Sequence, residues 1–448
     1  MNIKSFNKEL FMALIDRLNA KDVKYNIIGD YQHLPESVGH DVDLWTNDMK
    51  AFRSCLESAM KETGFLPILD NETHQGFNIA CYKRIGYSIC IMKFDVMHDT
   101  SFKSFLELVS SEEMEACTKP YKNFFIAGPE SEALMHFLYP MFEWGFIKKD
   151  VYKEDILRYY KEPLFFNKFV KLWGKTAASQ IIYLIEKKEW GTISKMMPAL
   201  KRKAVLKAVV KPHTWLKIWH TGVDLIGRWF KPTGQALAFC GLDGAGKTTI
   251  LDELNDIFVD LLKSKKVFYG YWRPFCLPEM RVLLGKKVVK DPTQKEREKG
   301  KTIIEPGRKP KGKLTSLVKL FYFWMDYMLA FFKYGQIQSR GGMVLFDRHY
   351  IDMIVHPQRF EMNVGRGLML FLYKFIPKPD FTFFLWCTPD EILLRKQEFS
   401  REEISKMIDD YNNVGQHIKN FTPIHTNTTI EEEVAEIFGY IASKCEKQ

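Results

Sequence analysis

The sequence has few cysteines, and none of them forms a recognisable pair. Its eight cysteines include no CxxC spacing, which is the usual sign of a zinc ligand pair or a dithiol redox motif. The dense framework of a small disulfide-bonded secreted domain is also missing. We therefore expect reduced, buried thiols in a cytoplasmic protein. The cysteines are Cys55, Cys81, Cys90, Cys117, Cys240, Cys276, Cys387 and Cys445.

The sequence also lacks a long apolar run without charge. The best transmembrane candidate, residues 314–334, contains Lys319, Asp326 and Lys333, which favours a buried helix instead. The first residues have no apolar core of a secretory signal. No RNA- or DNA-binding signature occurs, so nucleic acid is not an expected partner.

What the sequence does have is material for packed cores and an excess of positive charge. Its 448 residues are enough for two or three domains, and 46% of them are hydrophobic, which argues against overall disorder. The net charge of +10 suits nucleotides, nucleic acid or an anionic membrane surface, without choosing among them.

The strongest motif is a glycine-rich stretch, residues 241–248, with the sequence GLDGAGKT. It fits the pattern of Gly, four residues, then Gly-Lys-Ser/Thr. An apolar run precedes it and apolar residues at helical spacing follow it. Backbone N–H groups and a helix N-terminus at such a loop can hold phosphate. Lys247 can reach the β- and γ-phosphates, and the Thr248 hydroxyl can bind Mg²⁺. We therefore predict an ATP site at Gly241, Asp243, Gly244, Ala245, Gly246, Lys247, Thr248 and Thr249.

Two aspartates alternate with apolar residues on a predicted strand of the N-terminal region. Asp41 and Asp43 fall on one face of this strand and Val42 on the other, because successive side chains point to opposite faces. Asp95 lies on a later predicted strand. Carboxylates on neighbouring strands can share a divalent metal ion. We therefore name Asp41, Asp43 and Asp95 as candidate metal ligands.

Residues 129–200 show helical spacing of apolar residues and no recognisable chemistry. The basic stretch that follows, residues 201–232, contains Trp215, Trp219 and Trp229. A basic helix with tryptophans can lie in a membrane interface. The alternative, which we favour from the sequence, is a helix packed between its neighbouring regions.

Charged residues end several predicted strands of the C-terminal region. Strands and helices alternate there, which predicts a parallel sheet with ligands at the carboxyl ends of its strands. Asp347 is placed to orient Mg²⁺, and Arg273 and Arg348 are placed to meet a phosphate. Arg395, on a helix expected to continue to Arg401, can cover the transferring phosphoryl group as a lid. The catalytic candidates are Lys247, Asp347, Arg348 and Arg395.

Residues 235–443 resemble the thymidylate kinases. The phosphate loop, the strand end at Arg273, the Asp347–Arg348 turn and the helix reaching Arg395 occur in that family's order. The resemblance implies transfer of the γ-phosphoryl group of ATP to a nucleoside monophosphate, with Arg273 and Arg348 holding the acceptor phosphate. Two departures are Trp-Arg-Pro at residues 272–274, where the family usually has Arg-Glu-Pro, and a lysine-rich loop at 286–313.

The N-terminal region is similar to the polymerase-β type of nucleotidyltransferase. A helix and strand lead to Gly29, and Asp41, Asp43 and Asp95 follow; in that family three acids hold two Mg²⁺ ions. Asp30 stands where the family usually has serine. The fused arrangement resembles thymidylate-kinase-like proteins from bacterial surface-polysaccharide gene sets.

We therefore expect an α+β nucleotidyltransferase-like domain at 1–128, a helical region and basic linker at 129–232, and an α/β P-loop kinase at 233–448. The expected function is ATP- and Mg²⁺-dependent phosphoryl transfer to a nucleoside monophosphate or similar phosphorylated acceptor. Two alternatives stay open: a nucleotide-binding regulatory or scaffold protein of membrane glycan synthesis, and nucleotidyl transfer by the N-terminal domain. Peripheral contact with the inner face of the membrane and a homodimer are also left open.

Overall fold

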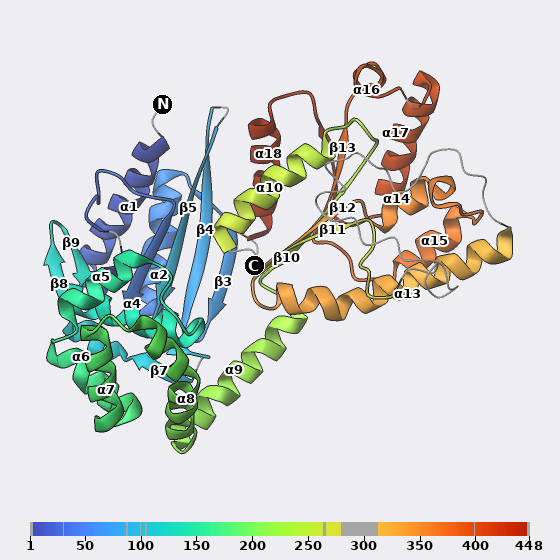
Figure 1. The fold of residues 1–448 in the computed structure, drawn as a ribbon. Coiled ribbons are helices and arrows are strands. Elements are labelled where there is room, and N and C mark those ends of the chain that lie inside the picture. Colours follow the sequence, from blue (N-terminus) through green and yellow to red (C-terminus); the bar gives the residue numbers. More distant parts are fainter. Residues whose placement is uncertain are drawn as a thin grey trace. The chain divides into compact units, whose positions relative to one another are not determined.

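The computed structural model describes residues 3–445, apart from residues 30, 87, 99, 104, 263–265, 279–311 and 398. The chain divides into two compact units, residues 1–85 with 89–227 and residues 228–447 (Figure 1). Asp30 and all but the last two residues of the loop expected at 286–313 lie outside the described residues. Among the helices that are described, none combines the length and apolarity needed to cross a membrane.

The first unit contains a seven-stranded mixed sheet with the order β3-β4-β5-β2-β1-β9-β8. Its strand β2 pairs in parallel with β5 and antiparallel with β1. Val42 and Leu44 are buried, whereas Asp41 and Asp43 are exposed, as the alternation in the sequence predicts. The strands are β1 (Tyr25–Ile28), β2 (Asp41–Thr46), β3 (Leu66–Thr73), β4 (Gly76–Ile85), β5 (Ser88–Met97), β8 (Thr118–Tyr121) and β9 (Phe124–Ala127).

Two hydrophobic cores hold the first unit together. Helices α1 (Ile3–Ala20) and α2 (Met49–Thr63) pack with Val42 and Leu44 in one core. Trp45, on the other face of the same strand, packs with the helical region in the second core. The remaining elements are β6 (Thr100–Phe102), β7 (Leu106–Val109), α3 (Ser111–Ala116), α4 (Pro129–Glu143), α5 (Asp150–Tyr159), α6 (Pro163–Trp173), α7 (Lys175–Glu186), α8 (Trp190–Val209) and α9 (Pro212–Phe230). The nucleotidyltransferase-like fold expected for residues 1–128 stays a prediction.

The second unit contains the parallel α/β sheet that the sequence predicts. Its five strands have the order β11-β12-β10-β13-β14, and every pair is parallel. Helices cover both faces of this sheet (Figure 1). Phe383 faces Tyr440 of α18, whereas its neighbour Phe384 faces Tyr411 of α17, because adjacent strand residues point to opposite sides. The strands are β10 (Gln235–Cys240), β11 (Val267–Tyr271), β12 (Met343–Asp347), β13 (Phe381–Trp386) and β14 (Phe421–His425).

One helix expected in the second unit is in fact two. Helix α16 ends at Arg395, and the next residue, Lys396, has an extended backbone. A new helix begins after Ser400, whose side chain accepts a hydrogen bond from the Glu403 N–H in a capping box. The expected continuous helix from Arg395 to Arg401 is therefore wrong. The helices are α10 (Lys247–Leu262), α13 (Lys313–Gln338), α14 (Tyr350–Val355), η2 (Pro357–Phe360), α15 (Arg366–Tyr373), α16 (Pro389–Arg395), α17 (Arg401–Gly415) and α18 (Ile430–Cys445).

The helical core of the first unit depends on large aromatic side chains, and this gives a stability test. Trp173 is fully buried and stacks on Phe142 with ring centroids 5.9 Å apart. Trp173→Ala should lower the free energy of unfolding by about 3–5 kcal/mol, because a large cavity replaces the indole. Trp144→Ala is the matched control, since Trp144 is exposed, and it should cost less than about 1 kcal/mol. Urea unfolding followed by circular dichroism measures both; equal losses would contradict the proposed core.

Candidate active site

The phosphate loop lies between β10 and α10, as its sequence predicts. Gly241, Gly244 and Gly246 all have positive φ angles, of 137°, 93° and 76°, which side chains with a Cβ rarely adopt. At Gly241 space is also limiting, because a Cβ there would lie 2.3 Å from the Leu385 carbonyl oxygen of β13. The loop therefore needs glycine at this position both for its backbone angle and for its contact with the neighbouring strand.

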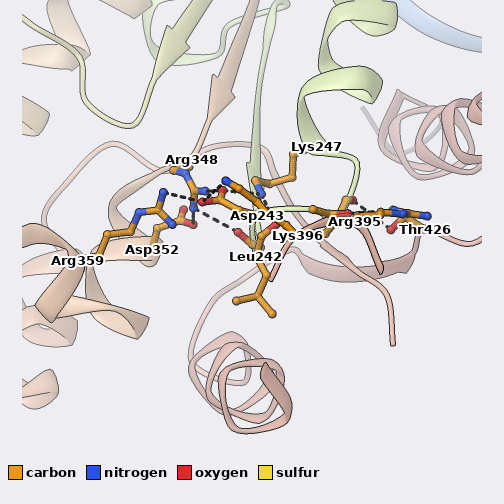
Figure 2. A network of polar contacts seen from close by, with 12 residues as sticks. Leu242, Asp243, Lys247, Arg348, Asp352, Arg359, Arg395, Lys396 and Thr426 are labelled. Carbon is orange, nitrogen blue, oxygen red and sulfur yellow. Dashed lines mark hydrogen bonds and ion pairs between the residues drawn. The ribbon is translucent and has the colours of Figure 1, made fainter. Parts of the chain in front are cut away.

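The Asp243 carboxylate of this loop is the centre of a network of basic side chains (Figure 2). It pairs with the Arg348 guanidinium, and its Oδ2 lies 2.8 Å from Arg359 Nη2. Lys247 and Lys396 each approach it to 3.9 Å. Burial alone would raise the pKa of Asp243, but the surrounding cations, Arg348 first, lower it well below its usual range. Asp243 therefore stays ionised and holds four cationic side chains near the loop.

Arg348 is buried and fixed by groups of the protein itself. Its φ angle is 71°, an uncommon backbone conformation for a residue with a side chain. Its Nη1 donates to the Gly241 carbonyl oxygen at 3.3 Å and lies 3.2 Å from Asp352 Oδ1. Tyr411 donates to the same Asp352 oxygen at 2.8 Å. These contacts connect Arg348 to the phosphate loop; its predicted role in holding an acceptor phosphate stays a prediction.

Lys247 begins helix α10 and its side chain is buried. Its Nζ donates to the Leu242 carbonyl oxygen at 2.6 Å, which curls the side chain back over the loop. Burial, reinforced by the nearby positive charge of Arg348, lowers the pKa of Lys247 to about 8. An ammonium group with this pKa gains strongly from an added anion.

The other predicted residues of the site lie around the same loop. Asp347 ends β12, pairs in register with Phe239 of the loop-bearing strand and is buried. Thr248 and Thr249 are exposed in the first turn of α10. Arg395 Nη1 donates to the Gly244 carbonyl oxygen at 3.0 Å. The structure therefore brings Asp347, Arg395 and the loop together, although their chemical roles stay predictions.

Arg273 follows β11 and is almost completely buried. Its Nε lies 3.0 Å from Asp326 Oδ2 of α13, and its Nη2 donates to the Leu277 carbonyl oxygen at 2.6 Å. The guanidinium carbon also lies 4.5 Å from the centre of the Phe275 ring. These contacts make Arg273 an organiser of the segment after β11. Its predicted contact with an acceptor phosphate is a separate hypothesis.

Three residues of the site were missed by sequence reasoning. Arg359 reaches Asp243 from a short helical turn, and Thr426 donates to the Ala245 carbonyl oxygen at 3.1 Å from the end of β14. Asp326 accepts the N–H groups of Phe275 at 3.2 Å and Leu277 at 2.6 Å. The charge inside the apolar run at 314–334 was a signal for Asp326; the other two have no local motif.

The three aspartates of the first unit meet at one place. Asp43 and Asp95 face each other across the parallel strands β2 and β5. One carboxylate oxygen from each of Asp41, Asp43 and Asp95 lies within 4.8 Å of the others. Carboxylate oxygens so placed suit a divalent ion such as Mg²⁺ or Mn²⁺. The convergence expected from the sequence is therefore present, and metal binding by these residues stays a prediction.

A lysine that sequence reasoning missed lies among these carboxylates. Lys93 Nζ is 3.3 Å from Asp41 Oδ1 and 2.5 Å from Asp95 Oδ2, and its side chain is buried. Burial opposes its positive charge, but Asp95 and then Asp41 outweigh that effect and raise the pKa of Lys93. Lys93 therefore remains charged and neutralises part of the acidic cluster.

Comparisons with known proteins add little to this geometry. No protein-family model matches the sequence, and no curated protein does. Among solved structures, thymidylate kinase from Ehrlichia chaffeensis is similar at 16% identity and a TM-score of 0.30, over 46% of this chain and 97% of that one. Thymidylate kinase from Candida albicans is similar at 14% identity and a TM-score of 0.34, over 48% and 94%. TM-scores this low assign neither fold nor function to this chain.

The position of Lys93 gives a test of the metal centre. Lys93→Met should raise the affinity for Mn²⁺ at least about tenfold, because a fixed cation no longer competes for two of the three carboxylates. Asp43→Asn should weaken Mn²⁺ binding, since it removes one charged ligand. Titration calorimetry or the electron paramagnetic resonance signal of Mn²⁺ measures both effects.

The control for this test is Lys83→Met, because Lys83 lies on the same sheet and pairs with Glu9 at 3.5 Å instead. It should leave Mn²⁺ affinity unchanged. If Lys93→Met behaved like Lys83→Met, the acidic cluster would not be the metal site.

Proposed function

We propose that the second unit transfers the γ-phosphoryl group of ATP, with Mg²⁺, to a phosphorylated acceptor such as a nucleoside monophosphate. The single observation that carries the proposal is the glycine-rich loop at the start of α10, with a buried Lys247 and a set of basic side chains around it. Backbone amides at a helix N-terminus and a fixed lysine are the groups that polyphosphates need.

The donor set of the site fits ATP and its metal ion. A buried ammonium group, a helix N-terminus and Arg395 next to Gly244 match a polyanion. The exposed Thr248 hydroxyl and the Asp347 carboxylate are the oxygen ligands that would hold Mg²⁺. When bound, Mg²⁺ would supply neutralising charge on the phosphate oxygens.

The protein's own contribution to such a reaction is positioning and charge. Phosphoryl transfer needs little covalent work from the enzyme. Lys247 would neutralise charge on the phosphates, and Arg395 would add a further cation at the loop. Asp243 has a supporting role, because it holds Arg348 and Arg359 in place beside the loop. The acceptor is the least defined part of the proposal.

A second candidate function is nucleotidyl transfer by the first unit. The observation that favours it is the convergence of Asp41, Asp43 and Asp95 on neighbouring strands, the arrangement that two-metal transfer chemistry uses. Products separate the two activities, because phosphoryl transfer releases ADP whereas nucleotidyl transfer releases pyrophosphate. ATP binding without either product would favour a regulatory or scaffold role.

Lys247→Ala is the direct test of the proposed kinase site. Turnover of ATP with a panel of nucleoside and sugar phosphates should fall at least about a hundredfold, because a fixed cation at the transferring phosphate is lost. Lys419→Ala, an exposed lysine of the same unit, should leave the rate unchanged. Unchanged ADP release by a folded Lys247→Ala protein would remove the loop from the reaction.

The lowered pKa of Lys247 predicts a pH dependence of ATP binding. Above pH 8 the free protein loses the Lys247 proton, whereas a bound polyphosphate favours the charged form and raises this pKa. ATP binding should therefore take up more protons at pH 9 than at pH 7, and affinity should fall as the pH rises above 8. Calorimetry in buffers of different ionisation enthalpy measures the uptake.

Lys247→Arg is the matched variant for this prediction, because arginine stays charged at both pH values. It should remove the difference in proton uptake between pH 7 and pH 9. The same difference in both proteins would assign the proton to another group.

A further inference from the structure

Helix α9 contacts the rest of the first unit through its polar side. Lys217 pairs with Glu107 at 3.5 Å, and Asp224 Oδ2 lies 3.0 Å from His74 Nδ1. Thr221 Oγ1 lies 3.4 Å from the other ring nitrogen of His74. A surface helix normally does the opposite and buries its apolar side. These polar contacts therefore leave the apolar side of α9 without that role.

The apolar side of α9 is exposed. Trp215, Trp219 and Ile226 are 58%, 68% and 63% exposed, and their spacing of four and seven residues places them on one stripe. Leu216 and Val223 beside this stripe are exposed as well. Thr214 is the single α9 residue that the structure buries. Hydrophobic side chains clustered in this way mark an interaction surface.

A basic cavity lies at the N-terminal end of this helix. Its volume is about 320 Å³, and four lysines and one glutamate line it: Lys171, Lys207, Lys211, Lys217 and Glu107. His213 and Thr214 bring the first turn of α9 to the cavity wall, which adds the partial positive charge of a helix N-terminus.

Apolar side chains adjoin these lysines along the chain. Leu206 and Val210, which precede Lys207 and Lys211, are exposed, as is Trp215 after His213. The same helix pair therefore presents positive charge in a cavity and apolar groups beside it.

We propose that this surface binds an anionic phospholipid bilayer, with a phosphate-bearing headgroup in the lysine-lined cavity and the Trp215–Trp219 side of α9 in the interface. Lysines next to tryptophans suit the boundary between headgroups and acyl chains, where charge attraction and apolar burial act together. Since no described helix could cross a membrane, α9 would lie on the bilayer. This inference is independent of the proposed kinase activity.

Membrane binding fits these observations better than a soluble phosphate compound or a protein partner. A soluble phosphate compound explains the cavity but leaves the exposed tryptophans without a role. An apolar protein surface explains the tryptophans but leaves the lysines facing no opposite charge. A bilayer with anionic headgroups supplies both chemistries side by side.

Co-sedimentation of the full chain with vesicles tests the proposal. Vesicles of phosphatidylcholine with phosphatidylglycerol should bind at least about tenfold tighter than vesicles of phosphatidylcholine alone, and added salt should weaken the difference. The double variant Lys207→Glu, Lys211→Glu should lose this preference. The double variant Trp215→Ser, Trp219→Ser should lose at least about tenfold in binding, whereas Trp219→Phe should retain it.

Lys187→Glu with Lys188→Glu is the matched control. Both lysines are exposed after α7, so the net charge changes equally while the cavity stays intact. This control should keep its vesicle preference, and the cavity variant should keep its circular dichroism spectrum and its rate of ATP turnover. Equal loss in the control would show that net charge alone drives binding, which would overturn the proposal.

Two further measurements separate the other occupants of this surface. Inorganic phosphate that binds the cavity by calorimetry, while vesicles do not bind, would assign the site to soluble anions. Analytical ultracentrifugation without lipid should give one species for the wild-type and Trp215→Ser, Trp219→Ser chains alike. A wild-type dimer that this variant abolishes would show that a second copy covers α9, and it would overturn membrane binding.

Discussion

The pairing of one carboxylate with several cations controls the second unit. Asp243 stands inside a loop built to attract phosphate, where a negative charge is expected to be unfavourable. It is accepted there because Arg348 and Arg359 contact it directly. Removing either partner would leave a buried charge without compensation. The loop, the end of β12 and the helical turn that carries Arg359 therefore depend on one another through a single carboxylate.

The first unit uses the same physical device with the signs reversed. There the fixed cation is Lys93, and the groups around it are Asp41 and Asp95. Three carboxylates so close together repel one another, and the lysine relieves that repulsion within the protein. The cost is competition, because any divalent ion that enters must share these oxygens with an ammonium group. Each unit thus carries its own counter-charge within its candidate site.

Helix α9 shows how a polar contact can determine what a surface is free to do. Its amphipathic pattern is clear in the sequence, and the packed arrangement favoured there would normally bury the tryptophans. His74 and Glu107 instead hold the polar side of the helix. The apolar side is left facing outward beside a lysine-lined cavity. The same sequence pattern therefore serves surface recognition once the orientation of the helix is fixed.

The sequence by itself determined the features that depend on local backbone geometry. The phosphate loop followed from glycines at positive φ between an apolar strand and an apolar-striped helix, and the exposure of Asp41 and Asp43 followed from the two-residue period of a strand. Only the tertiary structure revealed Lys93 among the aspartates, Arg359 on Asp243 and Asp326 beneath Arg273. These contacts join residues from different elements, so no spacing rule along the chain encodes them. The break after Arg395 and the outward face of α9 likewise depended on capping and on partners far away in the sequence.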